Sequence, residues 1–97
     1  MTIKPPHPGE TIREEYLVPL GMSVNALAKN LGIGTARLNE IVLGRRGITA
    51  DTALRLARYF NTTPELWINL QAFYDLRAAQ RKSWRTIQRQ VKPRQAA

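Results

Sequence analysis

A short polar stretch between two apolar runs carries the side chains best suited to recognition chemistry. Arginine can donate two hydrogen bonds to guanine O6 and N7, asparagine can pair with the adenine edge, and glutamate can accept from cytosine N4. Alanine and the methyl group of threonine can contact a thymine methyl group. The candidate base-reading residues are Thr35, Ala36, Arg37, Asn39 and Glu40. This mixture favours the reading of base-pair edges over catalysis.

The apolar residues interleaved with this stretch predict the element that holds it. Leu38, Ile41 and Val42 have the i, i+3, i+4 spacing of one helix face. We therefore expect a helix over residues 35–43, closed by Gly44. With the apolar face turned to the core, the candidate base-reading side chains should point away from it. Glu40 must then either read a base or form an ion pair with Arg37.

A second amphipathic helix is predicted directly before it, over residues 24–31. Ser23 is a good N-cap for this helix, and Gly32 suits the left-handed conformation that a tight turn requires. The inward face carries Val24, Leu27, Ala28 and Leu31. Two short helices joined in this way are typical of the helix-turn-helix, whose second helix enters the major groove of DNA. The alternative interpretation is an ordinary helical hairpin.

Phosphate contacts are expected around this corner, where they position a protein without reading sequence. Two arginines directly follow the second helix, and the amides at the start of the first helix can receive a phosphate. The candidate phosphate-contacting residues are Ser23, Asn25, Lys29, Arg45 and Arg46. Arg55 and Arg58 lie on a later helix and are interpreted as ordinary surface charges.

The remaining segments predict an all-α fold of five helices, because none shows strand-like alternation. Residues 1–8 contain three prolines and should form an extended N-terminal arm. Other helices are expected over residues 9–17, ending at Pro19, over residues 50–60, and from Pro64 onward. The last of these should close the core with one face of bulky side chains, namely Leu66, Trp67, Leu70, Phe73 and Tyr74.

The positive charge of the chain is concentrated at its C-terminal end. The formal net charge is +8, yet residues 1–75 hold eight Lys or Arg against seven Asp or Glu. Residues 76–97 hold the other seven basic residues and no acid. We interpret residues 9–76 as the folded domain and residues 77–97 as a basic tail, which favours a polyanionic partner. The alternatives for the tail are a frayed, solvated terminus, or a sixth helix carrying Trp84, Ile87 and Val91.

Composition excludes several other classes of site. The chain has no Cys, so it forms no disulfide and no thiolate metal site, and a single His leaves no metal-ligand pattern. His7 is more readily a packed or exposed ring than a ligand. No acid pair lies near a recognisable base or nucleophile, so neither an enzyme nor a cofactor site is expected. No apolar run has the length of a membrane span, and residues 1–10 lack a signal-peptide core, so we expect a cytoplasmic protein.

With these residues in place, the chain resembles the HigA-type antitoxins of type II toxin–antitoxin systems, in the lambda-repressor-like (XRE) helix-turn-helix family. The matching segments are HPGE at 7–10, REE at 13–15, LAKNLGI at 27–33, LGRRGIT at 43–49, DTALRLARYF at 51–60 and TPELWINLQAFYDL at 63–76. The resemblance implies a five-helix fold, a homodimer on a palindromic operator, and repression of the protein's own operon. It also implies a partner toxin of the HigB type, a RelE-like RNase. The basic tail lies outside the resemblance.

Two other functions are compatible with the sequence. One is a stand-alone XRE-family repressor without a toxin, and the other is a protein-interaction module whose helix-turn-helix does not bind DNA. The near-neutral balance of residues 1–75 is compatible with the second. For the basic tail we expect DNA phosphates as the partner, because an RNA-cleaving toxin is itself expected to be basic.

Overall fold

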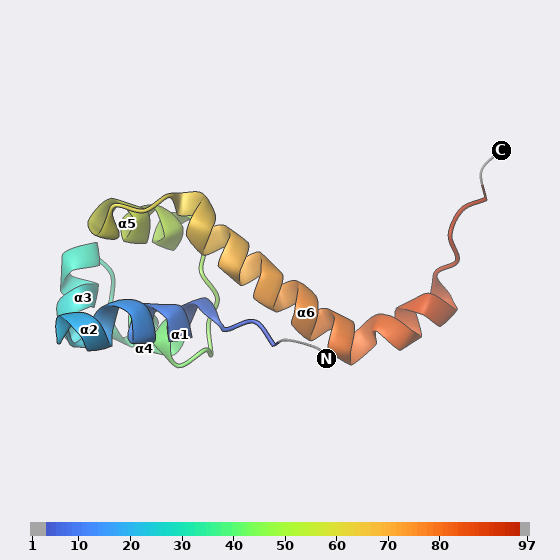
Figure 1. The fold of residues 1–97 in the computed structure, drawn as a ribbon, viewed down its shortest axis with the longest axis horizontal. Helices are drawn as coiled ribbons and strands as arrows, with labels where there is room; N and C mark the ends of the chain where they lie inside the picture. The colour runs from blue at the N-terminus through green and yellow to red at the C-terminus, as the bar shows by residue number, and fades with distance from the viewer. Residues whose placement is uncertain (1–3, 96–97) are drawn as a thin grey trace.

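The computed structural model describes residues 4–95, and its regular structure is entirely helical (Figure 1). The first helical rod consists of α1 (Pro8–Ile12), a π-helical turn η1 (Arg13–Leu17) and α2 (Val18–Leu20). It is followed by α3 (Val24–Leu31), α4 (Thr35–Val42), α5 (Ala50–Phe60) and α6 (Pro64–Gln90). The predicted all-α class is therefore confirmed. Residues 1–3 of the expected arm and 96–97 of the expected tail lie outside the described residues.

The first helical rod corrects the prediction that Pro19 ends the helix. The rod starts at Pro8 and continues through Pro19 to Leu20, where Gly21 closes it with a φ of 61°. Proline normally breaks a helix because its ring crowds the carbonyl four residues earlier. Here the π-helical turn just before the proline widens the helix, so that the Val18 N–H donates to the Arg13 carbonyl five residues back. The sequence pattern did not reveal this turn.

The core gathers apolar side chains from every helix except α2. It contains the predicted inward residues of α3 and α4, with Val24 only partly buried, together with Ala53, Leu56 and Ala57 of α5 and the fully buried Trp67 of α6. The indole Nε1 of Trp67 donates to Thr62 Oγ1 at 2.8 Å, which satisfies the one polar atom of this side chain. Tyr16 packs against both Phe60 and Trp67, with ring centroids 4.1 and 5.7 Å apart. The aromatic residues thus join the first rod to α5 and α6.

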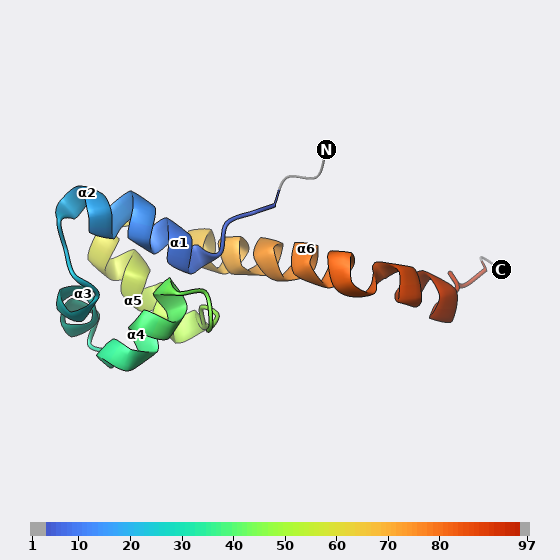
Figure 2. The ribbon, with the colours of Figure 1, turned by 90° about the horizontal axis from the view of Figure 1, so that it is seen from below.

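Gly9 lets α1 approach the end of α4 more closely than any other residue would. A Cβ atom at this position would lie 1.8 Å from the carbonyl oxygen of Ile41. Just before it, the imidazole Nδ1 of His7 accepts a hydrogen bond from the Gly9 N–H at 2.9 Å and caps α1. The backbone of α4 is therefore held from behind by the start of α1 (Figure 2).

The last helix differs from the prediction in two ways. Trp67 is buried, but Leu66 and Phe73 are 40% and 48% exposed, because α6 packs on α5 and α1 along one side only. Residues 77–90 form neither a frayed tail nor a separate helix, since α6 runs unbroken to Gln90. The expected domain boundary after Leu76 therefore falls inside a helix. Figures 1 and 2 show α6 projecting well beyond the other helices in a molecule of 55 × 27 × 23 Å.

Within residues 4–95, no helix combines the length and apolar character that crossing a membrane requires.

Candidate nucleic-acid interface

The corner between α3 and α4 is built by a left-handed turn and one side-chain hydrogen bond. Gly32 has a φ of 71°, and the Ile33 N–H donates to the Ala28 carbonyl at 3.1 Å. The Thr35 hydroxyl then donates to Asn25 Oδ1 at 2.8 Å, which links the first residue of α4 to the first turn of α3. These contacts fix the direction in which α4 leaves the turn.

Arg55 secures the same corner from α5, although the sequence suggested only a surface charge. Its guanidinium donates to Asp51 Oδ2 at 2.8 Å and to the Leu31 carbonyl at 3.0 Å. The Leu31 carbonyl lies in the last turn of α3, where carbonyls lack helical partners. Asp51, four residues earlier on α5, holds the arginine in place. Its role depends on a tertiary contact, so periodicity within α5 gave no signal for it.

Four of the five candidate base-reading side chains are accessible along the outer side of α4. Thr35, Ala36 and Asn39 are exposed, and Glu40 is half-buried. On the opposite side of the helix, Leu38 is fully buried. The helix thus presents a short polar surface from Thr35 to Glu40, as the spacing of the apolar residues predicted.

Arg37 is the exception, and its predicted outward orientation is wrong. Its side chain is half-buried, and Nη2 lies 3.3 Å from the hydroxyls of both Thr49 and Thr52 at the start of α5. Position 37 precedes Ile41 by one helical turn, so it lies on the flank of the buried face. Within the described part of the chain, Glu40 forms no ion pair with this arginine, so the pairing considered for the acid is not found.

The five candidate phosphate-contacting residues lie on α3 and on the loop after α4; Ser23 also caps α3, and Asn25 also holds the corner. Ser23 Oγ accepts from the Ala26 N–H at 3.0 Å, which leaves its own proton free to donate. Asn25 accepts from Thr35 through Oδ1, so its NH2 group remains available. The side chains of Lys29, Arg45 and Arg46 are exposed. Each of the five can therefore still offer a hydrogen-bond donor to an anion.

The loop that carries the two arginines is anchored by a residue that sequence reasoning missed. Gln71 of α6 accepts the Ile48 N–H through Oε1 at 2.7 Å, and Ile48 itself is buried. Gly47 lies directly against the Gln71 amide, so that a Cβ there would approach it to 3.1 Å. The Gln71 amide in turn donates to Asp75 at 2.9 Å. The loop is thus positioned by α6, which no local pattern indicated.

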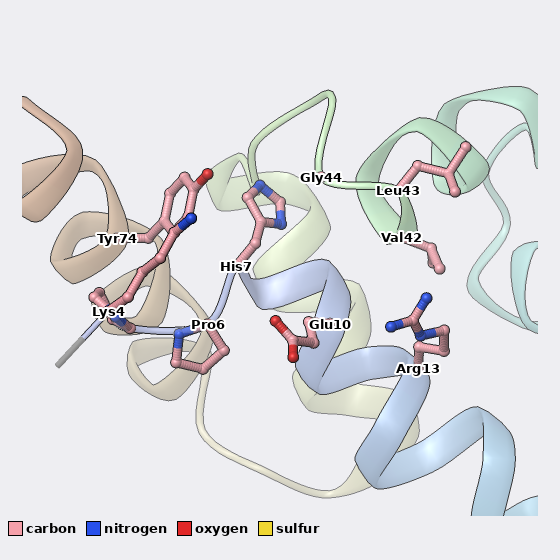
Figure 3. A pocket seen from close by; sticks show the side chains of 10 residues that line it. Lys4, Pro6, His7, Glu10, Arg13, Val42, Leu43, Gly44 and Tyr74 are labelled. Atoms are coloured by element: carbon pink, nitrogen blue, oxygen red, sulfur yellow. The ribbon is translucent and has the colours of Figure 1, made fainter.

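A hollow of about 700 Å³ lies between the N-terminal arm, the end of α4 and α6. His7 lies at its centre (Figure 3), is buried, and packs edge-on against Tyr74 with centroids 4.9 Å apart. Burial lowers the pKa of His7, and the nearby Asp75 carboxylate partly opposes that shift. Because Nδ1 accepts the Gly9 N–H, the neutral ring is the capping form. His7 is therefore a packed, structural ring, one of the two alternatives expected from sequence.

Comparison with known proteins agrees with this geometry. A helix-turn-helix family model matches residues 12–67. The virulence-associated protein I of Dichelobacter nodosus is 58% identical over 74 residues, which cover 76% of this chain and 68% of that protein. A HigA-family addiction module antidote protein from Coxiella burnetii has the same fold with a TM-score of 0.89 and 51% identity, covering 95% of this chain and all of that chain.

A second solved structure includes nucleic acid. It is the Pseudomonas aeruginosa antitoxin HigA with the higBA promoter, with a TM-score of 0.89 and 42% identity, covering 92% of this chain and 97% of that one. The family expected from the sequence motifs is thereby confirmed. This chain belongs to the lambda-repressor-like (XRE) helix-turn-helix family, and its close structural neighbours are antitoxins of the HigA family.

Proposed function

We propose that this protein is a DNA-binding antitoxin that represses its own toxin–antitoxin operon and neutralises a HigB-type toxin, a RelE-like RNase. The observation that carries the proposal is the exposed polar surface of α4, held outward by the Thr35–Asn25 hydrogen bond and by Gly9 behind it. A helix presented in this way fits the major groove. The solved complex of the neighbouring HigA with its promoter supports the DNA partner, and the family supports the toxin.

In this proposal, base reading falls to Thr35, Ala36, Asn39 and Glu40. Asn39 pairs with an adenine edge, Glu40 accepts from a cytosine amino group, and the two smaller residues contact thymine methyl groups. We reassign Arg37 to the junction between α4 and α5, because its guanidinium already contacts two threonine hydroxyls there. The acid at position 40 then serves recognition of cytosine rather than neutralisation of the arginine.

Phosphate contacts frame the same surface from both sides. Ser23 and Asn25 lie at the start of α3 and Lys29 in its last turn, whereas Arg45 and Arg46 follow the end of α4. A helix that enters the groove between two such groups is fixed in register by the two strands of the duplex. A homodimer would place two copies of α4 about 34 Å apart, one helical turn of DNA, on a palindromic operator.

Replacement of Asn39 by Ala tests the DNA half of the proposal. The change removes one adenine contact, worth about 1–3 kcal/mol of discrimination, at one base position per half-site. Binding of the full chain to promoter duplexes substituted at every position should show preference lost at that position alone. Thr86→Ala, which removes an exposed hydroxyl from α6, is the control and should leave every preference unchanged. An unaltered preference in the Asn39 variant would remove this residue from the interface.

The toxin half is tested in cells with the product of the adjacent gene. Expression of that product alone should arrest growth, and co-expression of this chain should relieve the arrest and yield a complex that co-purifies. If the neighbouring product is harmless or does not bind, while the promoter is still recognised, the protein is a stand-alone repressor.

A further inference from the structure

The half of α6 beyond the core exposes apolar side chains without any support from the rest of the molecule. Trp84 and Ile87 are 51% and 39% exposed, and Val91, the extended residue directly after the helix, is 63% exposed. The same segment repeats arginine every four residues from Arg77 to Arg89, which disfavours an isolated helix through like-charge repulsion. A helix of this length is marginal in water without packing. A surface that packs against Trp84 and Ile87 would therefore stabilise this part of the helix.

The other half of α6 offers an apolar groove of matching character. Leu66, Asn69, Leu70 and Phe73 line a hollow of about 320 Å³ on the side of the helix that the core leaves open. Leu66 and Phe73 are the two side chains that the sequence placed in the core and the structure exposes. One helix thus carries an exposed apolar groove near its start and an exposed apolar stripe near its end.

The groove and the stripe belong to one continuous heptad seam. From Leu66 to Ile87, seam positions of α6 are separated alternately by four and three residues, the a/d spacing of a coiled coil. Val91, the extended residue directly after the helix, continues the spacing in the sequence. In an antiparallel pair of such helices, each layer joins residues whose numbers have a constant sum. With that sum at 157, every apolar seam residue meets an apolar residue, in the pairs Phe73–Trp84, Leu70–Ile87 and Leu66–Val91.

The centre of this register is polar and self-complementary. Its two remaining seam positions are Arg77 and Gln80, whose numbers also sum to 157. Within one chain the Arg77 guanidinium already donates to Gln80 Oε1 at 2.6 Å and lies 4.8 Å from the centre of the Phe73 ring. Polar positions in an otherwise apolar seam can fix register. Here the Arg77–Gln80 pairing occurs twice, in two adjacent layers related by the two-fold axis that would pass between them.

Charge favours the same antiparallel direction. Residues 64–76 hold two acids, Glu65 and Asp75, and no base, whereas residues 77–90 hold five bases and no acid. A parallel pair would place the basic half of one helix along the basic half of the other. An antiparallel pair places it along the acidic half.

We propose that α6 pairs with α6 of a second copy of this chain as an antiparallel coiled coil centred on Arg77 and Gln80. This inference specifies the homodimer of the proposed function and rests on it. α6 bends about midway (Figure 1). A two-fold axis along the bisector of this bend would place the first half of one α6 beside the second half of the other. The bend is therefore compatible with an antiparallel pair. The Leu70 residues of the two copies would lie about 26 Å apart along the helix axis.

Disulfide cross-linking of the full chain tests the register, because the native sequence has no cysteine. Phe73→Cys and Trp84→Cys proteins, each half-exposed at the replaced side chain, are mixed and oxidised. In the proposed register these positions are opposite each other, so the mixture should give a cross-linked dimer amounting to about half of the chains, the statistical share of mixed pairs. Each protein alone should give none, because identical positions lie about 17 Å apart along the axis, beyond disulfide reach.

A mismatched cysteine pair tests the register, and a charge substitution tests whether the seam holds the dimer together. Mixing Phe73→Cys with Val91→Cys, one heptad out of register, should give no cross-link. Cross-linking of either single-cysteine protein by itself would overturn the antiparallel direction, and no cross-link in the matched mixture would overturn the seam. Trp84→Glu should convert the native dimer to monomer in light scattering, whereas Thr86→Glu, an equal charge off the seam, should not. Cross-linking and light scattering need neither operator nor toxin. A negative result would therefore overturn the coiled coil without bearing on whether the protein binds DNA or a toxin.

Discussion

Replacement of Gly9 by Ala is the sharpest perturbation of the scaffold behind α4. The added Cβ would lie 1.8 Å from the Ile41 carbonyl oxygen, 2.7 Å from its carbon and 2.9 Å from the Val42 Cα. All three are backbone atoms, so no side chain can rotate away. To bring the shortest contact out to 3.0 Å, α1 and α4 must separate by roughly 1.2 Å.

The cost of that separation exceeds the gain in helix propensity. Overpacking of a rigid site costs about 1–3 kcal/mol, and a backbone obstruction lies at the upper end of that range. Alanine recovers at most about 1 kcal/mol over glycine inside a helix. The net loss in the free energy of unfolding is therefore about 2 kcal/mol, or a fall of about 10 °C in the midpoint of thermal unfolding.

Urea unfolding at one fixed protein concentration measures the effect without a change in any dimer contribution. Gly34→Ala is the matched control, because a Cβ there meets nothing within 4 Å and the backbone φ is −67°. Its unfolding free energy should stay within about 1 kcal/mol of the native value, since the lost N-cap preference and the reduced unfolded-state entropy oppose each other. Equal stability of the Gly9 and Gly34 variants would refute the close approach of α1 to α4.

Three further predictions concern single side chains. Arg46→Ala should weaken binding to all DNA sequences alike and reduce the slope of log affinity against log salt by about one, as measured by fluorescence anisotropy; an unchanged slope would remove this arginine from the phosphate contacts. Arg37→Ala should lower the unfolding free energy by about 1 kcal/mol through loss of its bonds to Thr49 and Thr52, without changing which base is preferred at any operator position; a changed preference would restore it as a base reader. Stability of the native chain should fall as the pH drops below about 6.5, the unperturbed pKa of histidine. Burial lowers the pKa of His7 in the folded state, so the unfolded chain binds the proton first as the pH falls. His7→Asn, which keeps an acceptor for the Gly9 N–H, should flatten the dependence of the unfolding free energy on pH. An unchanged pH profile in unfolding titrations would show that another group causes the dependence.

Most of the corner that presents α4 could be predicted from local signals. The spacing of Leu38, Ile41 and Val42 identified the buried face of the helix, and Ser23 and Gly32 mark the cap and the turn that the structure contains. These features depend on residues within a few positions of one another. Periodicity and capping rules describe such features well.

Apart from the local π-helical turn before Pro19, the features that sequence reasoning missed depend on contacts between distant segments. Arg37 sits on the flank of a helix face, where only the position of α5 decides which way it turns. The need for Gly9 arises from the backbone of α4, more than thirty residues away. Leu66 and Phe73 have core-like spacing, but the first rod and α5 cover only one side of α6. Periodicity reports that a side chain is apolar, not what covers it.

Competition binding of the native full chain tests the central claim most directly. A duplex carrying the protein's own promoter is compared with a scrambled duplex of equal length and composition at physiological salt. The outward surface of α4 predicts that the promoter binds at least about a thousandfold more tightly, the lower range for specific recognition. Equal affinity for the two duplexes would contradict the account, because charge alone would then explain the binding.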